Sequence, residues 1–109
     1  MSSQLNTLDH TIMGILFKSD RALSIPTISA LSESPTHKVR YSIYKMMDLG
    51  FVVRRVDVGA FPLYSAVIDC PYFPPVALVA ERAFLAFDDA EFSKLVADVE
   101  RRANTKTLH

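Results

Sequence analysis

Basic and tyrosine side chains gather in the middle of the chain, between residues 35 and 56. Five basic residues and one acidic residue give this stretch a formal charge of +4, although the 109-residue chain as a whole is neutral. Guanidinium and ammonium groups bind phosphate, and tyrosine hydroxyls donate hydrogen bonds to it. These residue types suit the binding of a polyanion such as duplex DNA, with an affinity that falls steeply as salt rises. The candidate DNA-binding residues are Thr36, His37, Lys38, Arg40, Tyr41, Tyr44, Lys45, Arg54 and Arg55.

The sequence shows no pattern of residues that is typical of a catalytic site or a metal site. The three histidines lack the spacing of metal ligands and Cys70 is the only cysteine, so we expect no metal site and no cofactor. Asp88, Asp89 and Glu91 resemble paired carboxylates, but a helix cap explains them more simply. Cys70 follows Asp69, which disfavours its thiolate, so we expect an inert thiol. Without a recognisable pair of nucleophile and base, we expect a protein that is not an enzyme.

The composition indicates one folded domain of ordinary size. Half of the residues are hydrophobic and 22% are charged, which is unlike a disordered chain. The uncharged runs are shorter than the eighteen or so residues that a membrane crossing needs, so we expect no membrane partner. A single cysteine and the absence of basic residues directly after Met1 favour the cytoplasm as the location.

Apolar residues at helical spacing predict two helices before the basic stretch. The first covers about 7–18, with Asn6 or Thr7 as its cap. The second is about two turns long and lies within 24–32, where Pro26 falls in the first turn that tolerates proline. These two helices supply the apolar surface on which a third helix can rest.

The third predicted helix carries most of the basic stretch. We expect Ser34 to cap it, Pro35 to take its first helical position and Gly50 to end it. Projected at 100° per residue, its core side consists of Val39, Ile43 and Met46. Broadly opposite lie His37, Lys38, Tyr41 and Lys45, with Arg40 and Tyr44 on the flank. Tyr44 is equally suited to covering the edge of the core.

A change to β-branched residues after Gly50 predicts a β-hairpin. Its strands lie within 51–58 and 63–68, and residues 59–62 form its tip. Because side chains alternate between the two faces of a strand, only one of Arg54 and Arg55 can reach a phosphate. We expect the other to pair with an acidic side chain.

The C-terminal third predicts two helical segments, or one bent helix, after a proline-rich connector. Apolar residues mark a segment over 76–87, and a second one follows a capping sequence at Asp88. Their number exceeds what a small core must bury, so we expect them to form a dimer interface. The residues assigned to dimerisation are Val76, Val79, Phe84, Phe87, Phe92, Leu95, Val96 and Val99.

The segments from Leu23 to Leu31 and from Val39 to Val52, with Tyr64 closing the hairpin, resemble the winged-helix transcription regulators of the MarR and PadR type. The resemblance covers roughly residues 5–68 and implies a winged helix-turn-helix domain, which we place over 5–69. Together with the helical dimerisation segment inferred above, placed over 74–104, it gives a mainly α fold with a small β-hairpin. It implies a sequence-specific, homodimeric DNA-binding regulator, of which a repressor is the expected form. A small-molecule effector stays open as a further partner.

Neutral net charge and an uncharged hairpin tip favour a second interpretation. In this alternative the chain is a winged-helix module that binds other proteins in a larger assembly and does not read DNA.

Overall fold

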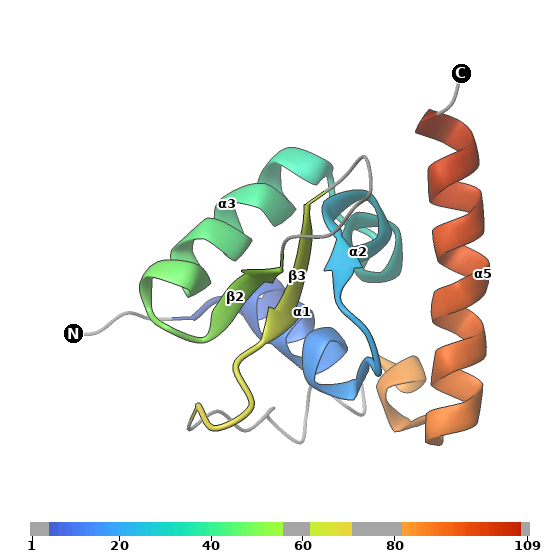
Figure 1. The fold of residues 1–109 in the computed structure, drawn as a ribbon, viewed down its shortest axis with the longest axis horizontal. Coiled ribbons are helices and arrows are strands. Elements are labelled where there is room, and N and C mark those ends of the chain that lie inside the picture. The colour runs from blue at the N-terminus through green and yellow to red at the C-terminus, as the bar shows by residue number, and fades with distance from the viewer. Residues whose placement is uncertain (1–4, 56–61, 71–81, 108–109) are drawn as a thin grey trace.

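In a computed structural model, residues 5–55, 62–70 and 82–107 are described, and they form a mainly helical body with a small antiparallel sheet (Figure 1). This arrangement is compatible with a winged helix. The elements, in chain order, are α1 (Thr7–Lys18), β1 (Leu23–Ser24), α2 (Ile25–Ser32), α3 (Thr36–Asp48), β2 (Val52–Arg55), β3 (Leu63–Ala66), the 3-10 helix η1 (Ala83–Ala86) and α5 (Asp89–Thr107).

The sheet has three strands in the order β1-β3-β2, and both pairings are antiparallel. The predicted hairpin is confirmed in strands β2 and β3, where Val52 lies opposite Ala66 and Arg55 opposite Leu63. Its tip and the end of its first strand lie outside the described residues. The sequence did not predict β1, because a strand of two residues has too little pattern to recognise.

Short polar motifs begin the first two helices. Asn6 and Asp9 form a reciprocal capping box at α1, in which each side chain accepts the other residue's backbone N–H. The Ser24 side chain caps α2 by accepting the N–H of Thr27 at 3.4 Å. Pro26 lies in the first turn of α2, as expected. These local motifs confirm the predicted starts of both helices.

The start and end of α3 differ in how well the sequence predicted them. The prediction that Ser34 caps α3 is wrong, because Pro35 takes the cap position and the Ser34 hydroxyl donates to the carbonyl of Ser32. The prediction that Gly50 ends the helix is confirmed. Gly50 adopts a φ of 85°, and the N–H of Phe51 reaches back to the carbonyl of Met46 at 2.9 Å.

The core lies where α1, α2 and α3 meet the sheet and α5. Its fully buried side chains include Ile12, Ile15, Ile28, Ile43, Met46 and Tyr64, together with Phe92 and Val96 from α5. Helix α5 packs mainly against α2, on the side of the molecule away from α3 (Figure 1). Among the described helices, none has both the length and the apolar character that a membrane crossing requires.

The two C-terminal segments are separate elements where the structure describes them. Residues 76–81 of the first predicted helix lie outside the described residues, and the remainder is the short 3-10 helix η1. Phe87 then adopts an extended conformation and breaks the path between η1 and α5. Helix α5 begins with the expected capping box, in which Asp88 accepts the N–H of Glu91 at 2.8 Å.

The assignment of Phe92, Val96 and Val99 to a dimer interface needs correction. Their exposed fractions are 1%, 0% and 7%, because α5 uses them to cover the chain's own core. Phe84 is half-buried and stacks on Phe92, with ring centroids 6.3 Å apart. Half-buried Leu95 packs at the edge of the same core, and Phe87 is exposed. Val76 and Val79 lie outside the described residues. Most of the described apolar residues that we assigned to a dimer interface thus pack against the core of their own chain.

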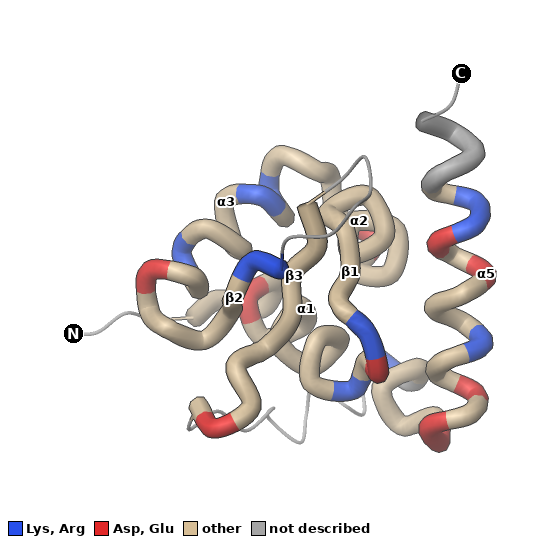
Figure 2. The backbone as a smooth tube through the Cα atoms, in the orientation of Figure 1, with Lys and Arg blue, Asp and Glu red and all other residues tan. Residues whose placement is uncertain are grey.

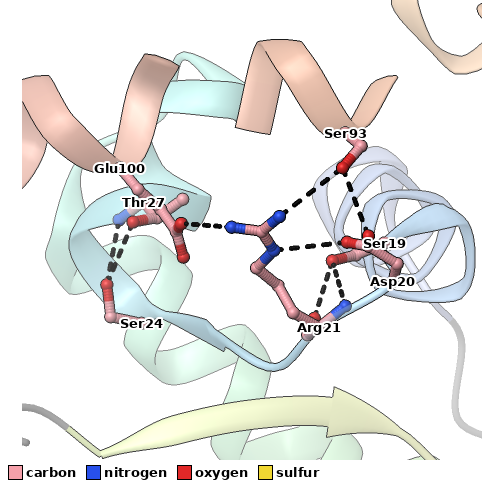
Figure 3. A network of polar contacts seen from close by, with 7 residues as sticks. All are labelled: Ser19, Asp20, Arg21, Ser24, Thr27, Ser93 and Glu100. Carbon is pink, nitrogen blue, oxygen red and sulfur yellow. Dashed lines mark hydrogen bonds and ion pairs between the residues drawn. The ribbon is translucent and has the colours of Figure 1, made fainter. Parts of the chain in front are cut away.

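A polar network fastens α5 to the connector between α1 and β1 (Figure 3). The Arg21 guanidinium donates to Asp20 at 3.2 Å, to Glu100 at 3.1 Å and to Ser93 at 3.5 Å. Ser93 in turn donates to the second oxygen of Asp20. The hydrogen bond from Arg21 lowers the pKa of the Asp20 carboxyl below its ordinary value of 3.8. The network therefore joins two segments that are far apart in the sequence.

Candidate nucleic-acid interface

Helix α3 lies on the outside of the molecule (Figure 1), and only one of its sides is buried. Val39, Ile43 and Met46 have no exposed surface, which confirms the predicted core side. On the other side Tyr41 is 72% exposed and Tyr44 is 51% exposed. The same side carries the exposed residues Thr36, His37, Lys38 and Arg40. A helix diameter of about 10–12 Å matches a B-DNA major groove about 12 Å wide, so this exposed side has a suitable size for that groove.

Basic residues continue from α3 onto the neighbouring strand β2 (Figure 2). Lys38 and Arg40 on the helix and Arg54 and Arg55 on the strand are all exposed. Within the described part of the chain, none of these four side chains takes part in an ion pair. Their charge therefore remains available to an external anion.

Lys45 differs from the other basic residues of α3. Its ammonium pairs with Oδ2 of Asp9, whose side chain is completely buried, while Lys45 itself is 27% exposed. The Ser42 hydroxyl donates to the other oxygen of the same carboxylate. Lys45 thus holds α3 against α1, a role that the sequence analysis missed. A serine inside the apolar stripe of α3 was the available signal for a buried polar partner.

Arg54 and Arg55 lie on opposite faces of the sheet, as the alternation predicted. Arg54 is opposite Tyr64, whose side chain is only 2% exposed. Arg55 lines a hollow of about 680 Å³ on the other face, together with Val53 and Ser65 and the end of α1. No ion pair with a described acidic residue is formed by either arginine, so the expected acidic partner is not found among these residues.

Tyr64 is a buried tyrosine of strand β3. Burial raises the pKa of its phenol above the ordinary value of 10.0, and a side-chain hydrogen bond with Tyr44 acts in the same direction. The charges of Arg54 and Arg40 oppose this increase.

The described residues contain no group of histidine, cysteine and carboxylate side chains that could hold a metal ion. Comparisons of the chain with protein-family models, with curated proteins and with solved structures found no match. Any inference about function therefore rests on the chain's own residues.

Proposed function

We propose that the chain is a winged helix-turn-helix regulator that binds duplex DNA sequence-specifically as a homodimer and acts as a repressor. One observation carries the proposal: apart from Lys45, the basic and tyrosine side chains of α3 are exposed on one side of the helix, next to further exposed arginines on β2. The order of helices and strands agrees with the architecture that presents a recognition helix in this way.

In the proposed complex α3 lies in the major groove. Thr36, His37 and Lys38 stand at the start of the helix, where recognition helices contact base edges. Arg40 lies one turn into α3, and Arg54 extends its charge onto β2 at the groove's edge. Lys45 is left out of this interface, because its ammonium already neutralises the buried Asp9.

We infer a homodimer because a single winged helix is small and contacts too few base pairs for high specificity. Its interface cannot use Phe92, Val96 or Val99, which are buried in the monomer. Exposed Phe87 and half-buried Leu95 remain available to a second copy on this side of the molecule.

The first test selects bound sequences from random duplex DNA and measures the affinity of the best one across a series of salt concentrations. We expect tight binding to the selected duplex and a steep fall in affinity with salt. His37→Ala should reduce the preference for the selected over a scrambled duplex, since its position faces base edges. Lys94→Ala, an exposed change on α5, serves as the control.

Absence of salt-sensitive binding to any duplex would overturn the proposal. A stoichiometric protein partner, retained by the DNA-free protein through Tyr41 and Tyr44, would then favour the alternative of a protein-binding module.

A further inference from the structure

A hollow of about 680 Å³ lies between the end of α1 and one face of the sheet. Its apolar lining includes Leu16 of α1 together with Val53 and Ala66 of the sheet, and Val53 is 39% exposed. A hollow of this kind has room for a side chain from another molecule, as have the pockets that receive anchor residues in protein interfaces. The residues on its rim indicate what kind of molecule fits it.

The turn after β3 (yellow in Figure 1) carries an isoleucine on this rim. The N–H of Cys70 donates to the carbonyl of Val67 at 3.2 Å, which closes a turn with Ile68 and Asp69 as its central residues. The N–H of Val67 donates to the carbonyl of Phe51 at 2.9 Å, so the turn is fixed to the start of β2. Ile68 is 91% exposed, although isoleucine is not among the residues that turns favour. Its side chain is thus an apolar knob beside an apolar hollow.

Two opposite charges on the same hollow have no described partner. Arg55 from β2 and Asp69 from the turn both line it, and both are exposed. Among the described residues, neither of them takes part in an ion pair. The other charged lining residues, Asp20 and Arg21, bind each other at 3.2 Å. A surface that presents one such cation and one such anion is electrostatically complementary to a second copy of itself.

We propose that two copies of the chain meet through this face, with Ile68 of each copy inserted into the hollow of the other. The proposal rests on the proposed function, which requires a homodimer, and it names the surface that forms the dimer. In a two-fold contact every interaction occurs twice. Asp69 follows Ile68 in the same turn, so the insertion brings Asp69 to the partner's Arg55. Arg55 thereby gains an acidic partner, while Arg54 on the opposite face of the sheet stays available to DNA.

The first test measures the mass of the full chain without DNA, by sedimentation equilibrium over a range of concentrations. We expect a dimer, and Ile68→Ser should raise its dissociation constant about a hundredfold, because a buried isoleucine is lost from each of two identical contacts. An isoleucine so exposed in the single chain contributes little to folding, so the variant remains folded. Leu49→Ser is the matched control. Leu49 is a 40% exposed apolar residue outside the hollow, and its replacement should leave the dissociation constant within about twofold of the parent.

Charge reversal tests the pairing of Arg55 with Asp69. Arg55→Glu and Asp69→Arg each bring like charges together at both contacts, and each should weaken the dimer about tenfold. The double variant Arg55→Glu/Asp69→Arg restores opposite charges and should return the dissociation constant to within about threefold of the parent. Lys94→Glu, a reversal at an exposed position of α5, is the control and should leave the dimer unchanged. A double variant that dimerises no better than the single variants would overturn the pairing.

These measurements separate failure of the contact from failure of the proposed function, because they contain no DNA. A chain that stays monomeric at every concentration would overturn the contact and leave the hollow to a different partner, even if single copies bind duplex DNA. A dimer that is dissociated by Phe87→Ser but not by Ile68→Ser would overturn this contact alone and place the homodimer at the start of α5. Dimerisation through Ile68 in a chain that binds no duplex would uphold the contact and overturn the proposed function.

Discussion

The ammonium of Lys45 lies 2.5 Å from a carboxylate oxygen of Asp9, so a charged pair crosses the contact between α3 and α1. Asp9 is entirely buried, and it also accepts the backbone N–H of Asn6 at 2.9 Å and the hydroxyl of Ser42. Lys45 and Ser42 of α3 therefore both bind the same carboxylate in α1. This contact sets the rotation of α3 about its axis and leaves Arg40 and Tyr41 on the outside.

Replacing Lys45 should destabilise the protein. In Lys45→Ala the buried carboxylate of Asp9 loses its counter-charge, and we expect the free energy of unfolding to fall by about 2 kcal/mol, since Lys45 is partly exposed. Urea denaturation measures the change. Lys38→Ala, on the exposed side of the same helix, should stay within about 0.5 kcal/mol of the parent. Equal stability of the two variants would show that the pair does not stabilise the contact.

The ionisation of Tyr64 should appear in the alkaline stability of the protein. Its pKa is raised above 10.0 by burial, so the folded state resists ionisation more than the unfolded chain does. The corresponding stabilisation is fully present below pH 10.0 and is lost as the pH rises through the higher pKa of the folded state. A tyrosine NMR titration checks the direction, with Tyr64→Phe identifying the signal. A Tyr64 signal that titrates below 10.0 would contradict it.

Gly50 should resist replacement because of its backbone conformation alone. Its φ is +85°, and apart from its chain neighbours no atom of the described residues lies within 4 Å of the position that a Cβ would take. We expect Gly50→Ala to lower the free energy of unfolding by about 1 kcal/mol, the cost of the left-handed conformation. Gly50→Asn should lose less, since asparagine tolerates this region better. Thermal denaturation compares the two variants, and an alanine variant as stable as the parent would exclude backbone strain.

Phe92 should stabilise the single chain and not a dimer. Its ring is 1% exposed and stacks with Phe84, so Phe92→Ala leaves a cavity that costs about 3–4 kcal/mol. Leu95→Ala, on the same helix but only half-buried, should cost less. Denaturation at two protein concentrations tests the assignment, because loss of a core contact is the same at both. If the loss in free energy of unfolding were larger at the lower protein concentration, Phe92 would instead belong to a subunit interface.

Local elements could be predicted because their causes are close together in the sequence. The boundaries of α1, the short α2 and the antiparallel pairing of β2 with β3 follow from apolar periodicity and β-branched runs. The capping box at Asp88 and the glycine at the end of α3 follow from motifs of a few residues. Even the core side of α3 was predictable, because helical geometry places Val39, Ile43 and Met46 together.

The sequence by itself thus determined the three helices α1, α2 and α3, the hairpin of β2 and β3, the start of α5, and which side of α3 is apolar, but not the short strand β1. Only the tertiary structure decided that Lys45 pairs with Asp9, that Arg54 lies beside Tyr64, and that Phe92 belongs to the monomer's core. The physical reason is that the energy of a charged or bulky side chain depends on the partner that folding brings to it. Such partners come from distant segments: Arg21 and Glu100, for example, are 79 positions apart in the sequence. A local sequence pattern cannot predict which distant residue will become the partner.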